Sequence, residues 1–138
     1  MANSTTLFSL PDGRKAVNVT ENKTLAIKDC GVVQNVIADG IAITMPAAVV
    51  SYAYTIRNGG VPKTSGTAGS GDDGSAIVKI IPNTTEYFSG CELATDASDT
   101  INNTKTTAKV GDEVQLVAAV ATGWNIVKMI GIWARIAI

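Results

Sequence analysis

Three groups of carboxylates are the residues of this chain best suited to chemistry: Asp72-Asp73, Asp96 with Asp99, and Asp112-Glu113. Ca²⁺ binds such oxygens, but the alternating ligand order and the terminal Glu of a calcium loop are missing. Glycoside hydrolysis needs two carboxyl groups that flank one bond, whereas adjacent residues of a strand point to opposite faces. Solvation and turn capping explain these groups better, and we expect no metal site and no catalytic pair.

Other catalytic groups are scarce. The chain contains no His, which excludes a Ser-His or Cys-His pair. The Gly-rich stretch 66–74 lacks the Gly-Lys-Ser/Thr ending of a phosphate-binding loop. Cys30 and Cys91 form no Cys-X-X-Cys pair, and they suit either buried small hydrophobic residues or a single disulfide outside a cell. We therefore predict a protein that is not an enzyme and that binds no cofactor.

Composition favours an all-β protein. A chain of 138 residues predicts a single domain, residues 1–138. It contains fourteen Val and fourteen Ile but only five Leu, and β-branched side chains suit strands better than helices. Eleven basic and twelve acidic residues leave no excess charge for nucleic acid or an anionic membrane, so neither is an expected partner. Without a secretory signal or a long apolar stretch, synthesis in a cytoplasm is expected.

Alternating apolar residues and turn signals predict about nine or ten short strands and no helix of ordinary length. Asp39-Gly40 predicts a hairpin between two apolar runs. Residues 61–75, rich in Gly and Ser, predict a flexible loop, and the polar residues 92–105 predict a surface loop with one short strand near Ile101. The other predicted strands are residues 5–10, 15–20, 24–28, 32–38, 41–45, 52–57, 76–81, 113–120, 124–129 and 132–138.

The two Trp residues lie in alternating strands near the C-terminal end of the sequence. A core or a subunit interface is the usual destination of so large a ring, and a stacking platform for a sugar or a base is the alternative. Val and Ile occupy both faces of stretches 114–120 and 126–132, so we expect self-association to cover surplus apolar surface. The assigned core or self-association anchors are Trp124, Trp133, Ile136 and Ile138.

Six short motifs, in order along residues 41–134, resemble a module common in the virion surface proteins of tailed bacteriophages. Members of that module carry "ITLPA", "YTIKN", "VTVxPN" and "AGDxVTLVSDGxNW", and end near "GTWA". This chain departs from the pattern at Val120-Ala-Thr-Gly123, where Asp-Gly-X-Asn is usual, and in its longer 61–75 stretch. Its motifs are Ile43-Thr-Met-Pro-Ala-Ala, Tyr54-Thr-Ile-Arg-Asn, Val78-Lys-Ile-Ile-Pro-Asn, Val110-Gly-Asp-Glu-Val-Gln-Leu-Val, Gly123-Trp-Asn-Ile-Val and Gly131-Ile-Trp-Ala.

The chain is most similar to the head decoration, or cement, proteins of this group. The resemblance implies a homotrimer of antiparallel β-sandwiches or jelly-roll-like barrels on the outer capsid surface of the virion. Such a protein ties neighbouring major capsid subunits together against internal DNA pressure. Modest contacts made by each copy become strong when they are repeated over a lattice.

Residues 1–10 are the expected capsid-contacting segment, because chain termini can order on a partner surface. The alternative function is a tail fibre or spike module, in which loops 61–75 and 92–105 would recognise a host-cell surface receptor. The absence of heptads disfavours that alternative, since fibres often carry a coiled coil. The assigned capsid contacts are Ala2, Asn3, Ser4, Thr5, Thr6, Leu7 and Phe8.

Overall fold

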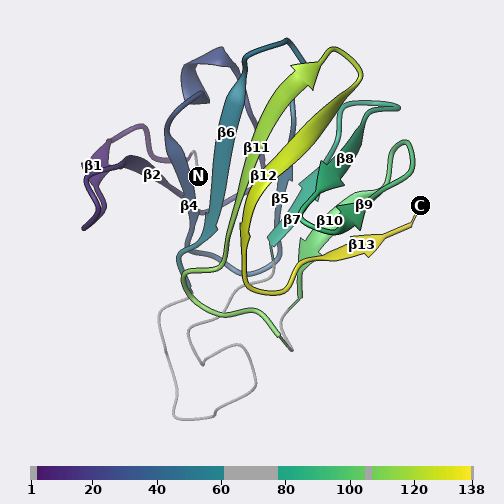
Figure 1. The fold of residues 1–138 in the computed structure, drawn as a ribbon. Coiled ribbons are helices and arrows are strands. Elements are labelled where there is room, and N and C mark those ends of the chain that lie inside the picture. The colour runs from purple at the N-terminus through teal and green to yellow at the C-terminus, as the bar shows by residue number, and fades with distance from the viewer. Residues whose placement is uncertain (1–2, 61–77, 105–106, 138) are drawn as a thin grey trace.

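The computed structural model describes residues 3–60, 78–104 and 107–137, which form two β-sheets (Figure 1). The larger sheet has the order β1 (Phe8–Ser9), β2 (Lys15–Val19), β4 (Val33–Val36), β6 (Ala53–Asn58), β11 (Glu113–Val120), β12 (Gly123–Ile130), β8 (Tyr87–Gly90) and β9 (Leu93–Ala94). The smaller sheet has the order β13 (Ala134–Ile136), β10 (Thr100–Asn103), β7 (Val78–Ile81), β5 (Ile41–Thr44) and β3 (Lys23–Thr24). The predicted all-β class is confirmed.

The described residues form thirteen strands, more than the nine or ten expected, because β1, β3 and β9 span only two residues each. The prediction of a strand over residues 24–28 is wrong, since β3 ends at Thr24 and the 3-10 turn η1 (Ile27–Asp29) follows. The expected surface loop 92–105 contains β9 and β10 and buries Asp99 and Asn103. Residues 61–75, the predicted flexible loop, lie outside the described residues.

The expectation of antiparallel sheets is wrong, because five of the eleven strand pairings are parallel. From β2 to β7 the chain places consecutive strands in alternate sheets. Neighbours within a sheet are therefore two strands apart in sequence and run in the same direction, as β2, β4 and β6 do. Parallel neighbours need a crossover of about a dozen residues or more, and each crossover here contains a strand of the other sheet.

The turn at Asp39-Gly40 illustrates this path. It does not close a hairpin, because β4 before it belongs to the larger sheet and β5 after it belongs to the smaller one. Gly40 has a φ of +70°, a conformation that glycine adopts without steric cost. The sequence therefore identifies the turn correctly but not the pairing of the strands that it joins.

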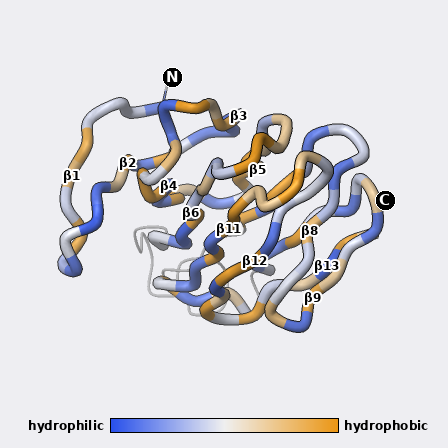
Figure 2. The backbone as a smooth tube through the Cα atoms, turned by 45° about the horizontal axis from the view of Figure 1, so that its top comes forward, coloured by the Kyte–Doolittle hydropathy of each residue, from blue (hydrophilic) through white to orange (hydrophobic). Residues whose placement is uncertain are grey.

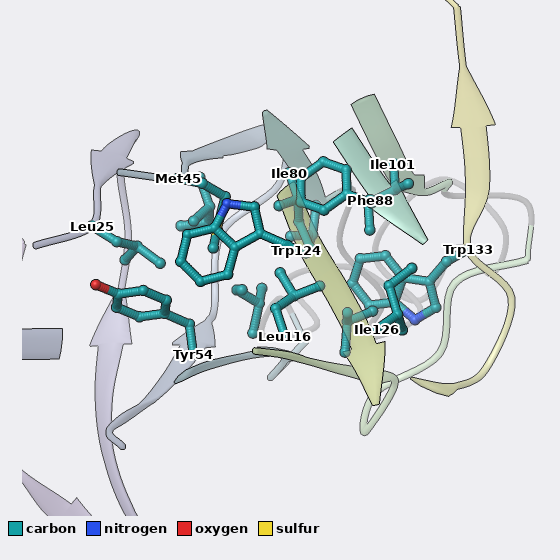
Figure 3. Close-up of a cluster of buried hydrophobic side chains, with 14 of the residues drawn as sticks. Leu25, Met45, Tyr54, Ile80, Phe88, Ile101, Leu116, Trp124, Ile126 and Trp133 are labelled. Carbon is teal, nitrogen blue, oxygen red and sulfur yellow. The ribbon is translucent and has the colours of Figure 1, made fainter. Parts of the chain in front are cut away.

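Both sheets contribute to one hydrophobic core, and Trp124 of β12 is its largest fully buried side chain (Figure 3). Its ring makes an edge-to-face contact with Tyr54 of β6, with ring centroids 5.5 Å apart. The smaller sheet supplies Ile43, Ile80 and Ile101 to the same cluster. The buried indole N–H of Trp124 has no acceptor among the described residues, so packing alone positions the ring.

The predicted alternation of apolar residues holds in the long strands. Val114, Leu116 and Ala118 of β11 are fully buried and alternate with the half-buried Gln115 and Val117, and Figure 2 shows both hydrophobic (orange) and hydrophilic (blue) stretches along β11 and β12. The register between these strands shifts after Gln115, whose partner is Lys128 while the partner of Leu116 is Ile126. Val127 is left without a partner in this pairing, and it is exposed.

Replacing Trp124 by Ala should lower the free energy of unfolding by about 3 to 5 kcal/mol, because it opens a cavity between the two sheets. The matched control is Val127→Ala on the same strand, which should change it by no more than about 0.5 kcal/mol because the side chain is exposed. Urea unfolding followed by far-UV circular dichroism measures both. Equal effects of the two substitutions would contradict the assignment of Trp124 to the core.

Candidate functional site

The segment assigned to capsid contact is attached to the domain at both of its ends. Asn3 Oδ1 accepts hydrogen bonds from the backbone N–H groups of Thr20 (2.8 Å) and Glu21 (3.1 Å), and Asn3 Nδ2 donates to the carbonyl of Glu21 (3.1 Å). At the other end, β1 pairs with β2 and half-buries Phe8. Ala2 lies outside the described residues. The segment between these attachments, Ser4, Thr5, Thr6 and Leu7, is exposed.

A cavity of about 210 Å³ lies beneath this segment. Its lining combines the apolar Leu7, Val17 and Val32 with the charged Lys23, Lys28 and Asp29. Lys23 Nζ is committed to the domain, since it lies 3.2 Å from Asp29 Oδ1 and donates to Gln34 Oε1 at 2.7 Å. The cavity is smaller than the roughly 300 Å³ at which ordinary small-molecule sites begin, so it is a poor fit for a cofactor.

The Asp96 and Asp99 carboxylates both contact Arg135 of the edge strand β13. Arg135 Nε lies 2.6 Å from Asp99 Oδ2, and its Nη2 lies 2.6 Å from Asp96 Oδ2. The hydrogen bond to Asp99 is the largest of the effects that raise the pKa of the Arg135 guanidinium. Through these two contacts, the loop that precedes β10 is bound to strand β13. Asp72 and Asp73 lie outside the described residues.

Asp112 belongs to a buried polar network that joins the two sheets. Its Oδ2 accepts hydrogen bonds from Asn103 Nδ2 of β10 (2.9 Å) and from the backbone N–H of Lys109 (2.9 Å). Asn58 of β6 donates through Nδ2 to Asn103 Oδ1 at 2.8 Å. Gly131, with a φ of +87°, lies so close that an added Cβ would collide with the Asp112 carboxylate. These hydrogen bonds account for the burial of the Asp112 carboxylate, so no bound ligand is needed to explain it.

A second polar network crosses the opposite face of the larger sheet. Asn18, Asn35, Arg57 and Glu113 lie side by side on β2, β4, β6 and β11. Asn35 Nδ2 donates to Asn18 Oδ1 (3.0 Å), and Arg57 Nη1 donates to Asn35 Oδ1 (2.8 Å). Glu113 Oε1 pairs with Arg14 Nη2 at 2.8 Å, which raises the pKa of the Arg14 guanidinium. Because Glu113 is only 2% exposed, its carboxylate is inaccessible to a substrate.

Asp112 and Glu113 therefore point in different directions, as the sequence predicts for adjacent residues at a strand. Among the described residues, no three His, Cys, Asp or Glu side chains are grouped so that they could hold a metal ion. No helix in the described ranges is long and apolar enough to cross a membrane. The side chains of Asn18, Asn35, Asn58, Asn103 and Asp112 are used in contacts within the domain.

The assigned anchors lie in two kinds of position. Trp124 and Trp133 are buried in the core, and Trp133 Nε1 donates to the carbonyl of Ile130 at 3.0 Å. Ile136 lies on β13 and is 42% exposed, whereas Ile138 lies outside the described residues. Sequence reasoning missed Val49 and Val50 as surface residues, although their run of apolar residues beside Pro46 was a signal. Exposed large apolar residues of the described part are Leu7, Ile27, Val49, Val50, Val110, Val120, Val127, Ile130, Ile132 and Ile136.

Comparison of the chain with protein-family models, with curated protein sequences and with solved structures finds no significant match.

Replacing Asp112 by Ala should lower the free energy of unfolding by at least about 2 kcal/mol, because Asn103 Nδ2 and the Lys109 N–H lose an acceptor inside the protein. The control is Asp96→Ala, whose side chain is 82% exposed and whose loss should cost about 1 kcal/mol or less. Chemical denaturation of both variants tests this. An Asp112 variant as stable as the Asp96 variant would show that the network contributes little.

Cys30 and Cys91 are both free thiols, so the disulfide considered from the sequence is not formed. A thiol reagent should titrate two groups in the denatured protein without prior reduction. In the native protein the exposed Cys91 should react faster than the half-buried Cys30. Finding no titratable thiol before reduction would contradict the structure.

Proposed function

We propose that this chain is a structural virion protein that binds the outer surface of an assembled phage capsid and bridges its major capsid subunits. The observation that carries the proposal is a contrast between its carboxylates, which are engaged in internal contacts, and its large apolar side chains, many of which are exposed. Asp96 and Asp99 contact Arg135, Asp112 contacts Asn103 and Glu113 contacts Arg14, whereas ten large apolar side chains of the described residues stay exposed. Exposed apolar side chains that gather into patches mark protein interaction surfaces. The phage-module motifs support the same assignment.

We further propose that the two sheets form a β-sandwich and that the protein works as a homotrimer. The shared core supports a sandwich, since residues of both sheets meet in one cluster. A trimer would multiply the capsid contacts of each particle, and several weak contacts made together bind tightly.

Residues 3–8 are the proposed capsid-contacting segment within the described chain. The hydrogen bonds of Asn3 and the pairing of β1 with β2 fix both of its ends before any partner arrives. A segment that is already ordered loses less conformational entropy on binding than a free terminus does. Its exposed hydroxyl groups and Leu7 suit a polar contact with a small apolar centre.

Deleting residues 1–8 should strongly reduce occupancy on undecorated capsids of the phage that encodes the chain, because the contact surface is removed. Co-sedimentation with those capsids measures occupancy, and circular dichroism confirms that the deletion variant is folded. Full occupancy of the deletion variant would exclude this segment as the contact. If the intact protein is retained on host cells and not on capsids, it is a receptor-binding module and the cement proposal is wrong.

A further inference from the structure

The cavity beneath the exposed segment 4–7 has the size of a single side chain. It lies beside β2, the strand next to the edge strand β1 of the larger sheet (Figure 1), and its volume is about 210 Å³. A dry apolar cavity of about 150 Å³ holds one benzene ring. The cavity therefore has room for one ring or one branched aliphatic group with a small polar end.

The charged residues that line the cavity leave one positive charge without a partner. Lys23 Nζ lies 3.2 Å from Asp29 Oδ1, and Asp29 Oδ2 accepts the backbone N–H of Ala26 at 2.9 Å, so both charges of this pair are already used. Lys28, on η1, is exposed and has no hydrogen-bond or ion-pair partner among the described residues. Two Lys and one Asp line the cavity, which gives the lining a net positive charge although the whole chain carries −1.

The uncharged part of the lining combines apolar walls with hydroxyl groups. Val17 and Val32 lie on the side of the domain, and Leu7, which is 55% exposed, belongs to the segment above. Ser4 and Thr5 line the same cavity, and a hydroxyl group can donate a hydrogen bond to a carboxylate oxygen. An apolar group with one negatively charged end therefore matches both parts of the lining.

We infer that the cavity binds an apolar group that carries a carboxylate, presented by the major capsid subunit, and that Lys28 pairs with this carboxylate. The inference rests on the proposed capsid contact of residues 3–8 and names the chemistry which that contact recognises. A free acid of this size has too few atoms to bind tightly. A side chain that fills a cavity at the centre of a larger interface acts as an anchor instead.

Other occupants match the lining less well. A cation would approach the ammonium groups of Lys23 and Lys28 while the Asp29 carboxylate is already paired. A neutral apolar group would remove water from Lys28 without supplying an opposite charge. A strongly hydrated anion such as inorganic phosphate would lose water against Val17 and Val32 without gaining polar contacts there.

The first test uses the full chain and two probes that differ in charge, isocaproate and its neutral amide, isocaproamide. In amide NMR spectra, millimolar isocaproate should shift the backbone signals of Thr5, Leu7 and Val32, and isocaproamide should bind about tenfold more weakly because it cannot pair with an ammonium group. Lys28→Gln should abolish this difference. The matched control Lys128→Gln, at an exposed lysine of β12, should keep it.

The second test identifies the partner by co-sedimentation with undecorated capsids. Lys28→Glu and Lys128→Glu change the net charge of the protein equally, so they expose any general electrostatic effect to the same degree. Lys28→Glu should bind the capsids about tenfold more weakly than the unchanged protein, and Lys128→Glu should bind like the unchanged protein. Circular dichroism shows whether each variant is folded, and Lys28→Gln takes the place of Lys28→Glu if that variant unfolds.

The outcomes separate this inference from the proposed function. If isocaproate and isocaproamide bind equally, or if neither binds, the cavity does not recognise a carboxylate and the inference is wrong, whatever the capsids show. If isocaproate is preferred but Lys28→Glu and Lys128→Glu occupy capsids equally, the capsid subunit is not the occupant and the inference is overturned. If the unchanged protein does not bind capsids, the proposed function is wrong and the assigned partner with it, while the two probes still decide whether the cavity recognises a carboxylate.

Discussion

Burial of the apolar faces of the two sheets against each other is the constraint on which the rest of the structure depends. The apolar faces meet in one cluster, with Trp124 from the larger sheet beside Ile80 and Ile101 from the smaller one. The chain adds strands to the two sheets in turn, because consecutive strands from β2 to β7 lie in alternate sheets. As a result, the core contains residues from the early, middle and late parts of the sequence. Polar groups at the margins of the core, such as Asn103 and Asp112, then have to find partners across the sheets.

Local patterns predict the strands well but not their partners. Alternation gives β11 with its observed bounds, since every second residue from Val114 to Ala118 is buried. The pairing of β4 with β2 and β6 has no such signal, because a turn such as Asp39-Gly40 looks the same whether it joins paired strands or crosses between sheets. The buried network is equally invisible in the sequence. Asn58 and Asn103 are 45 positions apart in the sequence. Each is a polar residue of a type common in solvated loops, so nothing in its neighbourhood in the sequence predicts that the two side chains meet inside the domain.

The positions of the charged groups bear on what kind of protein this is. The ion pairs of Arg14 with Glu113 and of Arg135 with Asp99 connect segments that lie far apart in the sequence. Reactive proteins place such groups in clefts with perturbed surroundings and open access. The accessible surface of the described chain carries the segment 4–7, ten large apolar side chains, and exposed charged side chains such as Lys28, Lys79 and Lys128. The proposed cement function would depend on binding energy repeated over many copies of such a surface.

The edge strand β13 has a consequence for unwanted pairing with other chains. An exposed edge is a template on which further strands can add without limit, leading to fibres and aggregates. This edge has only three residues, and its central residue, Arg135, is fixed by two carboxylates. Another strand that approached would meet a short edge with a charged centre. Growth by strand addition is therefore discouraged at this edge.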